Sequence, residues 1–111
     1  MYPTPRRTPR IPFIAVAEIA YRQSGGTTRL AGHVITLNFH GCYIELPNTL
    51  PIGREVSIKI FAETEWFAAT AKVVYELAGS AMGLAFDDVP VKSRGILRTW
   101  LLKASGGPER L

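Results

Sequence analysis

The sequence has little cysteine and no long apolar run. Cys42 is the one cysteine among 111 residues, so the chain forms no internal disulfide and no metal site made of cysteines alone. No apolar stretch approaches the roughly 18 residues that a membrane-spanning helix needs. The apolar stretch after the first arginines is interrupted at Glu18, unlike the core of a signal peptide. We therefore expect a cytoplasmic protein that does not insert into a membrane.

The net charge of +4 is concentrated at one end of the chain. Arg6, Arg7 and Arg10 lie in the first ten residues with no acid among them, and residues 11–111 carry ten bases and nine acids. Such a local excess favours one anion-binding segment over a protein that coats nucleic acid. Prolines in the same segment disfavour a helix. We expect residues 1–10 to form a basic arm rich in proline and arginine.

Residues 11–104 are predicted to form one all-β domain that ends in a helix. Alternation of apolar and polar residues predicts six strands, at 13–22, 27–37, 42–45, 55–61, 66–75 and 81–86. Short strands at this spacing favour a six-stranded antiparallel β-barrel. From Pro90 the apolar spacing becomes that of an α-helix, which Gly106 ends. Residues 105–111 are expected to be a flexible tail.

The same pattern assigns places to the aromatic side chains. Phe67 and Tyr75 share the apolar face of their strand, so both are expected in the core. Trp100 belongs to an apolar helical stripe that is expected to close one mouth of the barrel, although a homodimer contact would use the same residues. Trp66 is expected to be exposed and is the best candidate for contact with a partner. Cys42 is expected to be a small buried residue.

Two short motifs stand at the start of the predicted barrel. Arg6 and Arg10 have the spacing R-x-x-x-R just before the first strand. Thr36, Asn38 and Gly41 lie in the segment T-L-N-F-H-G, at a break between two strands. Together these motifs resemble those of the PilZ domain, a bacterial receptor for the second messenger cyclic di-GMP (c-di-GMP). In that family R-x-x-x-R is followed by [D/N]-x-S-x-x-G.

The resemblance extends over about residues 6–103 and implies a PilZ-like barrel that binds c-di-GMP. It includes the segments L-P-I-G at 50–53 and M-G-L-A-F at 82–86. Arginine suits this ligand because its guanidinium pairs bidentately with guanine or phosphate and stacks on bases. The ligand would order the arm against the barrel, and the signal would leave by contact with a protein effector. The candidate ligand-binding residues are Arg6, Arg7, Arg10, Thr36, Asn38, His40 and Gly41.

The second motif departs from the family pattern at two positions. Thr36 replaces the usual acid or amide, and Asn38 replaces the usual serine. Because charge-assisted hydrogen bonds contribute about 1.5–3 kcal/mol and neutral ones about 1, the loss of a carboxylate would weaken binding roughly three- to thirtyfold. Gly41 is expected to supply a positive φ to a polar turn.

Two other functions remain open at this point. The departures from the motif support a PilZ-like interaction protein that has lost nucleotide binding. The arginines could instead hold a phosphate backbone, as in a small nucleic-acid-binding β-barrel, which we disfavour. A steep dependence of affinity on salt would identify the nucleic-acid binder, because a dinucleotide has only two phosphates.

Catalysis and metal binding have no support in the sequence. A glycine-rich phosphate loop with lysine and a G-x-S-x-G motif are both missing, so we expect no enzyme and no catalytic residues. His40 and Cys42, with His33 on the preceding strand, are too few to make a zinc site. We expect no metal and no cofactor apart from the suspected ligand. The acidic pairs are expected to be solvated turn residues: Glu63 with Glu65, and Asp87 with Asp88.

Overall fold

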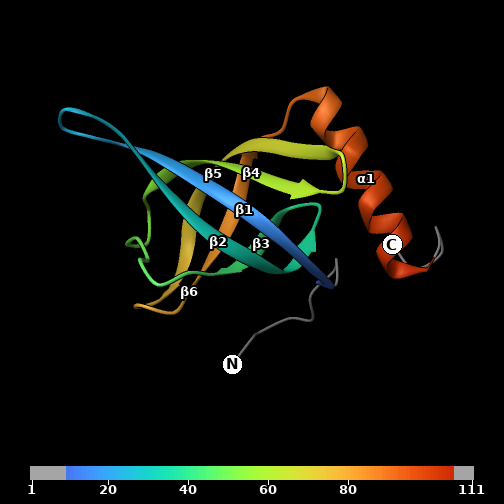
Figure 1. Ribbon diagram of the computed structural model, residues 1–111, viewed down its shortest axis with the longest axis horizontal. Helices are drawn as coiled ribbons and strands as arrows, with labels where there is room; N and C mark the ends of the chain where they lie inside the picture. The colour runs from blue at the N-terminus through green and yellow to red at the C-terminus, as the bar shows by residue number, and fades with distance from the viewer. Residues whose placement is uncertain (1–9, 107–111) are drawn as a thin grey trace.

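The computed structural model describes residues 10–106 as a closed barrel followed by one helix (Figure 1). The elements are β1 (Ile11–Gln23), β2 (Gly26–Asn38), β3 (Gly41–Glu45), β4 (Glu55–Ala62), β5 (Glu65–Leu77), β6 (Ala81–Asp88) and α1 (Val91–Ser105). Around the barrel the strands follow the order β1-β2-β3-β6-β5-β4, and antiparallel pairing of β1 with β4 closes it. The predicted six-stranded antiparallel barrel with a C-terminal helix is therefore confirmed.

Alternating side chains fill the barrel. In β4, Val56, Ile58 and Ile60 point inward and are buried, while the residues between them are exposed. Phe67 of β5 is fully buried, as expected. Each strand thus contributes one apolar face to a common core, and this burial is the main favourable term in folding.

Helix α1 covers one end of the barrel (Figure 1). Leu97, Trp100 and Leu101 of its apolar stripe are buried, and the Trp100 ring stacks on Phe13 of β1 with 5.3 Å between ring centroids. The stripe that could have served a homodimer is therefore covered within the chain. Gly106 adopts a left-handed conformation with φ of 87° and ends the helix, as predicted. Between residues 10 and 106, no helix is long and apolar enough to cross a membrane.

A β-bulge in β5 changes which side chains face the core. Val73 pairs with Leu84 of β6 and Tyr75 pairs with Gly83, so Val74 is an extra residue in β5. One extra residue reverses the inward and outward positions that follow it. Tyr75 is consequently 47% exposed, and the prediction that it lies in the core is wrong.

A second bulge, at Ile35 in β2, has the same effect. Val34 pairs with Ile44 of β3, and Thr36 pairs with Tyr43. The extra residue brings Leu37 into the core, where it is fully buried. Thr36 then lies on the outer face of the barrel, the same face as Tyr43.

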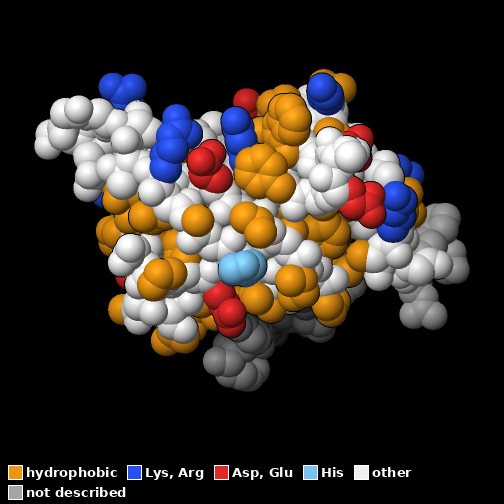
Figure 2. Space-filling view, viewed as in Figure 1, with side chains coloured by type: hydrophobic (Ala, Val, Ile, Leu, Met, Phe, Trp, Pro, Cys, Tyr) orange, Lys and Arg blue, Asp and Glu red, His pale blue; other side chains and the backbone are white. Residues whose placement is uncertain are grey.

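Apolar side chains also gather on the outer face formed by β1 and β4 (Figure 2). Val16 pairs with Phe61, and Phe61 pairs with Trp66, so the three side chains form one row across β1, β4 and β5. Trp66 is 53% exposed, which confirms its predicted exposure.

Candidate functional site

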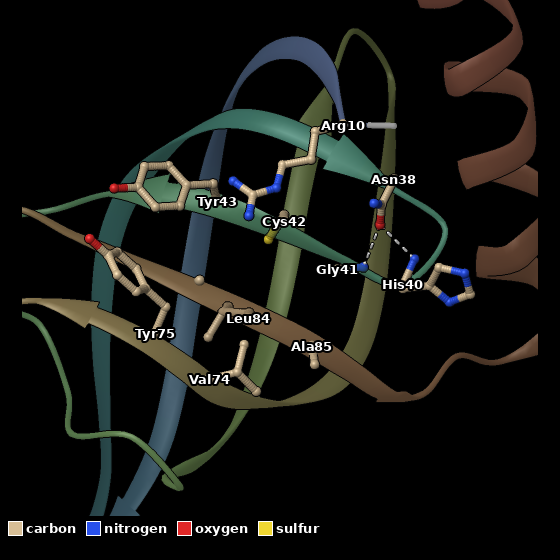
Figure 3. A pocket seen from close by; sticks show the side chains of 11 residues that line it. Arg10, Asn38, His40, Gly41, Cys42, Tyr43, Val74, Tyr75, Leu84 and Ala85 are labelled. Atoms are coloured by element: carbon tan, nitrogen blue, oxygen red, sulfur yellow. Dashed lines mark hydrogen bonds between the residues drawn. The ribbon is translucent and has the colours of Figure 1, made fainter. Parts of the chain in front are cut away.

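A cavity of about 400 Å³ opens on the outer face of the barrel, beside the hairpin between β2 and β3 (Figure 3). Its size falls within the range of small-molecule sites. Among its described lining residues there is one arginine and no carboxylate, so the cavity favours an anionic ligand. The lining residues are Arg10, Asn38, His40, Gly41, Cys42, Tyr43, Val74, Tyr75, Gly83, Leu84 and Ala85.

The β2–β3 hairpin at the cavity is held by the side chain of Asn38. Its Oδ1 accepts hydrogen bonds from the backbone N–H of His40, at 2.8 Å, and of Gly41, at 3.0 Å (Figure 3). Asparagine favours turns because its short side chain can accept such bonds. The backbone N–H of Phe86 also donates to the carbonyl oxygen of His40, at 2.8 Å, which ties the hairpin to β6. The turn is therefore fixed from two sides.

Gly41 is required for space. The described glycines with a positive φ do not include Gly41, so the prediction that it supplies a positive φ is wrong. A Cβ atom at this position would instead collide with the backbone carbonyl oxygen of Leu84 on β6. The hairpin can approach β6 this closely only because residue 41 has no side chain.

One cation and two aromatic rings stand at the rim of the cavity. The guanidinium carbon of Arg10 lies 5.7 Å from the ring centroid of Tyr43, within the range of a cation–π contact. The rings of Tyr43 and Tyr75 lie 5.9 Å apart and are tilted by 35°. Both side chains reach the same opening from different strands (Figure 3). The site thus presents positive charge beside flat apolar surfaces.

Cys42 lies on the wall of the cavity, but its thiol is expected to be unreactive. Its side chain is buried, as predicted, and burial raises the pKa of the thiol from 9.0 to about 12. A thiol that stays protonated near neutral pH is a poor nucleophile and a poor metal ligand. In the part of the chain that the structure describes, no group of three or more His, Cys, Asp or Glu could hold a metal ion.

The structure brings four of the seven candidate residues together. Arg10, Asn38, His40 and Gly41 line one cavity. Thr36 does not line it, and its buried hydroxyl has no hydrogen-bond partner among residues 10–106. The other two candidates, Arg6 and Arg7, lie outside the described residues.

Sequence reasoning missed seven of the eleven described lining residues, among them Tyr43, Val74 and Tyr75. Tyr43 follows Gly41 by two positions, so the motif itself could have pointed to it. Val74 and Tyr75 reach the cavity through the bulge in β5, which the alternating pattern does not reveal.

A second cavity, of about 500 Å³, is less suited to an anion. Its lining includes Arg22 and Arg54, but also Glu55 and Asp87. The Arg54 guanidinium already donates to the carbonyl oxygen of Arg22, at 2.9 Å, and lies 4.7 Å from the ring centroid of Tyr21. Its charge is thus partly engaged by contacts within the chain. The cavity beside Arg10 is therefore the stronger candidate for an anion-binding site.

Comparison with known proteins agrees with this fold. The family model described as the PilZ domain matches residues 4–103. Two solved structures share the fold at low identity. One is the PilZ domain with c-di-GMP of YcgR from Escherichia coli, with a TM-score of 0.70 and 14% identity, covering 91% of this chain and 92% of that one. The other is the PilZ domain of CeSA from a cellulose-synthesizing bacterium, with a TM-score of 0.63 and 18% identity, covering 83% of this chain and 94% of that one. A search of curated proteins found no match. With its family model matched over nearly the whole barrel and helix, the chain belongs to the PilZ domain family.

Proposed function

We propose that this chain is a receptor for c-di-GMP and that the ligand binds in the cavity beside Arg10. The observation that carries the proposal is the composition of the cavity: one arginine and two tyrosines, with no carboxylate among the described lining residues. Such a surface suits c-di-GMP, a dianion with two flat bases. The PilZ domain of YcgR, which has a similar fold, was solved with c-di-GMP, and this supports the choice of ligand.

Arg10 is the residue best placed to contact the ligand. It is exposed, and its guanidinium lies over the Tyr43 ring at the cavity rim. From there it can pair with a phosphate or with guanine O6 and N7. Arg6 and Arg7 would add further contacts from the arm. The β2–β3 hairpin, which the Asn38 side chain holds by two hydrogen bonds, forms a fixed edge of the cavity.

Thr36 weakens the case for strong binding. It stands where the family usually has an acid or amide, and its buried hydroxyl offers no charged acceptor to the N–H groups of guanine. We therefore expect lower affinity than a complete motif would give.

The chain would act by binding, without catalysis. A ligand held by Arg10 would order the preceding arm against the barrel. The changed surface would then be recognised by a protein effector, which is how the signal would leave.

Calorimetric titration of the full chain with c-di-GMP tests the proposal, with GTP and linear pGpG as controls. We expect selective binding at micromolar concentration or tighter, with a shallow dependence on salt. Arg10→Ala should weaken binding most, by about ten- to hundredfold, because one charge-assisted hydrogen bond contributes about 1.5–3 kcal/mol. Arg6→Ala should come next.

Arg94→Ala is the matched control, because Arg94 is exposed on α1 and does not line the cavity. It should leave the affinity unchanged. No heat up to about millimolar c-di-GMP would overturn the proposal in favour of a ligand-free interaction protein. Full affinity after loss of both Arg6 and Arg10 would overturn the site.

A further inference from the structure

The bulge in β5 places two consecutive side chains at the same cavity. Val74 is 54% exposed and Tyr75 is 47% exposed, and both line it. In a regular strand, neighbouring side chains point to opposite faces. Bulges are frequent beside binding sites, where they redirect a side chain. The extra residue therefore has the effect of moving a large aromatic ring from the core to the cavity.

The residue opposite Tyr75 makes room for this ring. Gly83 pairs with Tyr75 across β5 and β6. A Cβ atom at Gly83 would lie 3.2 Å from the Cβ atom of Tyr75, closer than ordinary van der Waals contact. A side chain at this position would thus require Tyr75 to shift by a few tenths of an ångström.

Of the two rings, Tyr75 is the more exposed, at 47%, whereas Tyr43 is half-buried. Tyr43 already contacts Arg10 and Tyr75, with centroid distances of 5.7 and 5.9 Å. A base inserted between the two tyrosines would need about 7 Å between ring centres, twice the ~3.5 Å contact distance of carbon atoms. A base in this cavity would therefore lie against the exposed side of Tyr75.

We propose that Tyr75 is a ligand-binding residue on which a purine base of the ligand stacks. The inference rests on the proposed function and extends it to the mode of base recognition. The described cavity offers no carboxylate to the N–H edge of guanine. Stacking on an aromatic ring needs no such group, because every base has a π-face. In this chain the face of the base would be recognised more strongly than its edge.

Titration of three variants with c-di-GMP tests this. Tyr75→Leu should weaken binding by about tenfold or more, as expected for the loss of one base–aromatic contact. Tyr75→Phe keeps the ring and should stay within about twofold of the original chain. Trp66→Leu removes an aromatic side chain of similar exposure that lies outside the cavity, and it should bind as the original chain does.

The H8 proton of the bound guanine gives a second readout, by NMR. Stacking should move its signal upfield in the original chain and in Tyr75→Phe, and this movement should be lost in Tyr75→Leu. If the original chain binds and Tyr75→Leu, shown to be folded by circular dichroism, keeps its affinity, the stacking role is wrong and the receptor function stands. If the original chain does not bind, both proposals fail together.

Discussion

The side-chain oxygen of Asn38 accepts a hydrogen bond from the backbone N–H of Gly41, at 3.0 Å, and closes the hairpin beside the cavity. The same oxygen accepts a second bond, from His40, at 2.8 Å. Asn38 occupies the motif position where the family usually has serine. Here it has a structural task that can be measured without any ligand.

Replacing Asn38 should separate the need for an acceptor from the need for an amide. Asn38→Asp keeps an oxygen for both N–H groups and should unfold at nearly the same denaturant concentration. Asn38→Ala leaves both donors without this acceptor and should lower the free energy of unfolding by about 1–2 kcal/mol. Equal stability of the two variants in urea unfolding would contradict the role of the side-chain oxygen.

Gly41→Ala should be strongly destabilising, because the added methyl group meets a backbone oxygen that cannot rotate away. We expect the free energy of unfolding to fall by about 1–3 kcal/mol or more, as for other overpacked sites. Gly95→Ala is the matched control: nothing lies within 4 Å of a Cβ atom there, and alanine favours a helix by up to about 1 kcal/mol over glycine. Thermal unfolding compares the two variants. Similar melting temperatures would show that the close approach of residue 41 to the backbone of Leu84 does not exclude a side chain.

Thr36→Val tests the buried hydroxyl. The side chains are similar in shape, and the hydroxyl oxygen of Thr36 has no partner among the described residues. Removing an unsatisfied buried polar group should leave the free energy of unfolding unchanged or raise it by up to about 1–3 kcal/mol. The same variant should bind c-di-GMP as the original chain does. A clear loss of affinity would instead place Thr36 in the binding site.

Cys42 should react slowly with iodoacetamide in the folded protein. Because burial raises the pKa of its thiol to about 12, the thiol stays protonated at pH 8–9, where an ordinary cysteine with a pKa of 9.0 ionises substantially. Labelling followed by mass spectrometry should show rapid reaction only after denaturation. Rapid labelling of the native chain at pH 8 would mean that the thiol is accessible.

Most of the fold could be predicted because alternation is a local property. In β4, Val56, Ile58 and Ile60 show the core face directly, and Pro90 and Gly106 bound the helix closely. A β-bulge, in contrast, cannot be recognised from the alternating pattern of apolar and polar residues. Val74 and Tyr75 are compatible with either face, so only the register against β6 shows that both turn outward.

The site was predicted in part for a similar reason. The motif spacing identified the hairpin residues, since Asn38 and Gly41 lie within one turn. Position 41 requires glycine because of its contact with Leu84, which lies more than forty positions away in the sequence. No local pattern contains that information. The partnership of Tyr43 with Tyr75 likewise needs three strands to be placed side by side.

Backbone amide NMR during titration with c-di-GMP would locate the bound ligand on the barrel residue by residue. We expect the largest changes in chemical shift at Arg10, at residues 38–43, at Val74 and Tyr75, and at residues 83–85. Amides around Arg22 and Arg54, at the other cavity, should change little. Changes centred on that second cavity would place the ligand elsewhere, and no change up to about millimolar ligand would show that the chain is not a c-di-GMP receptor.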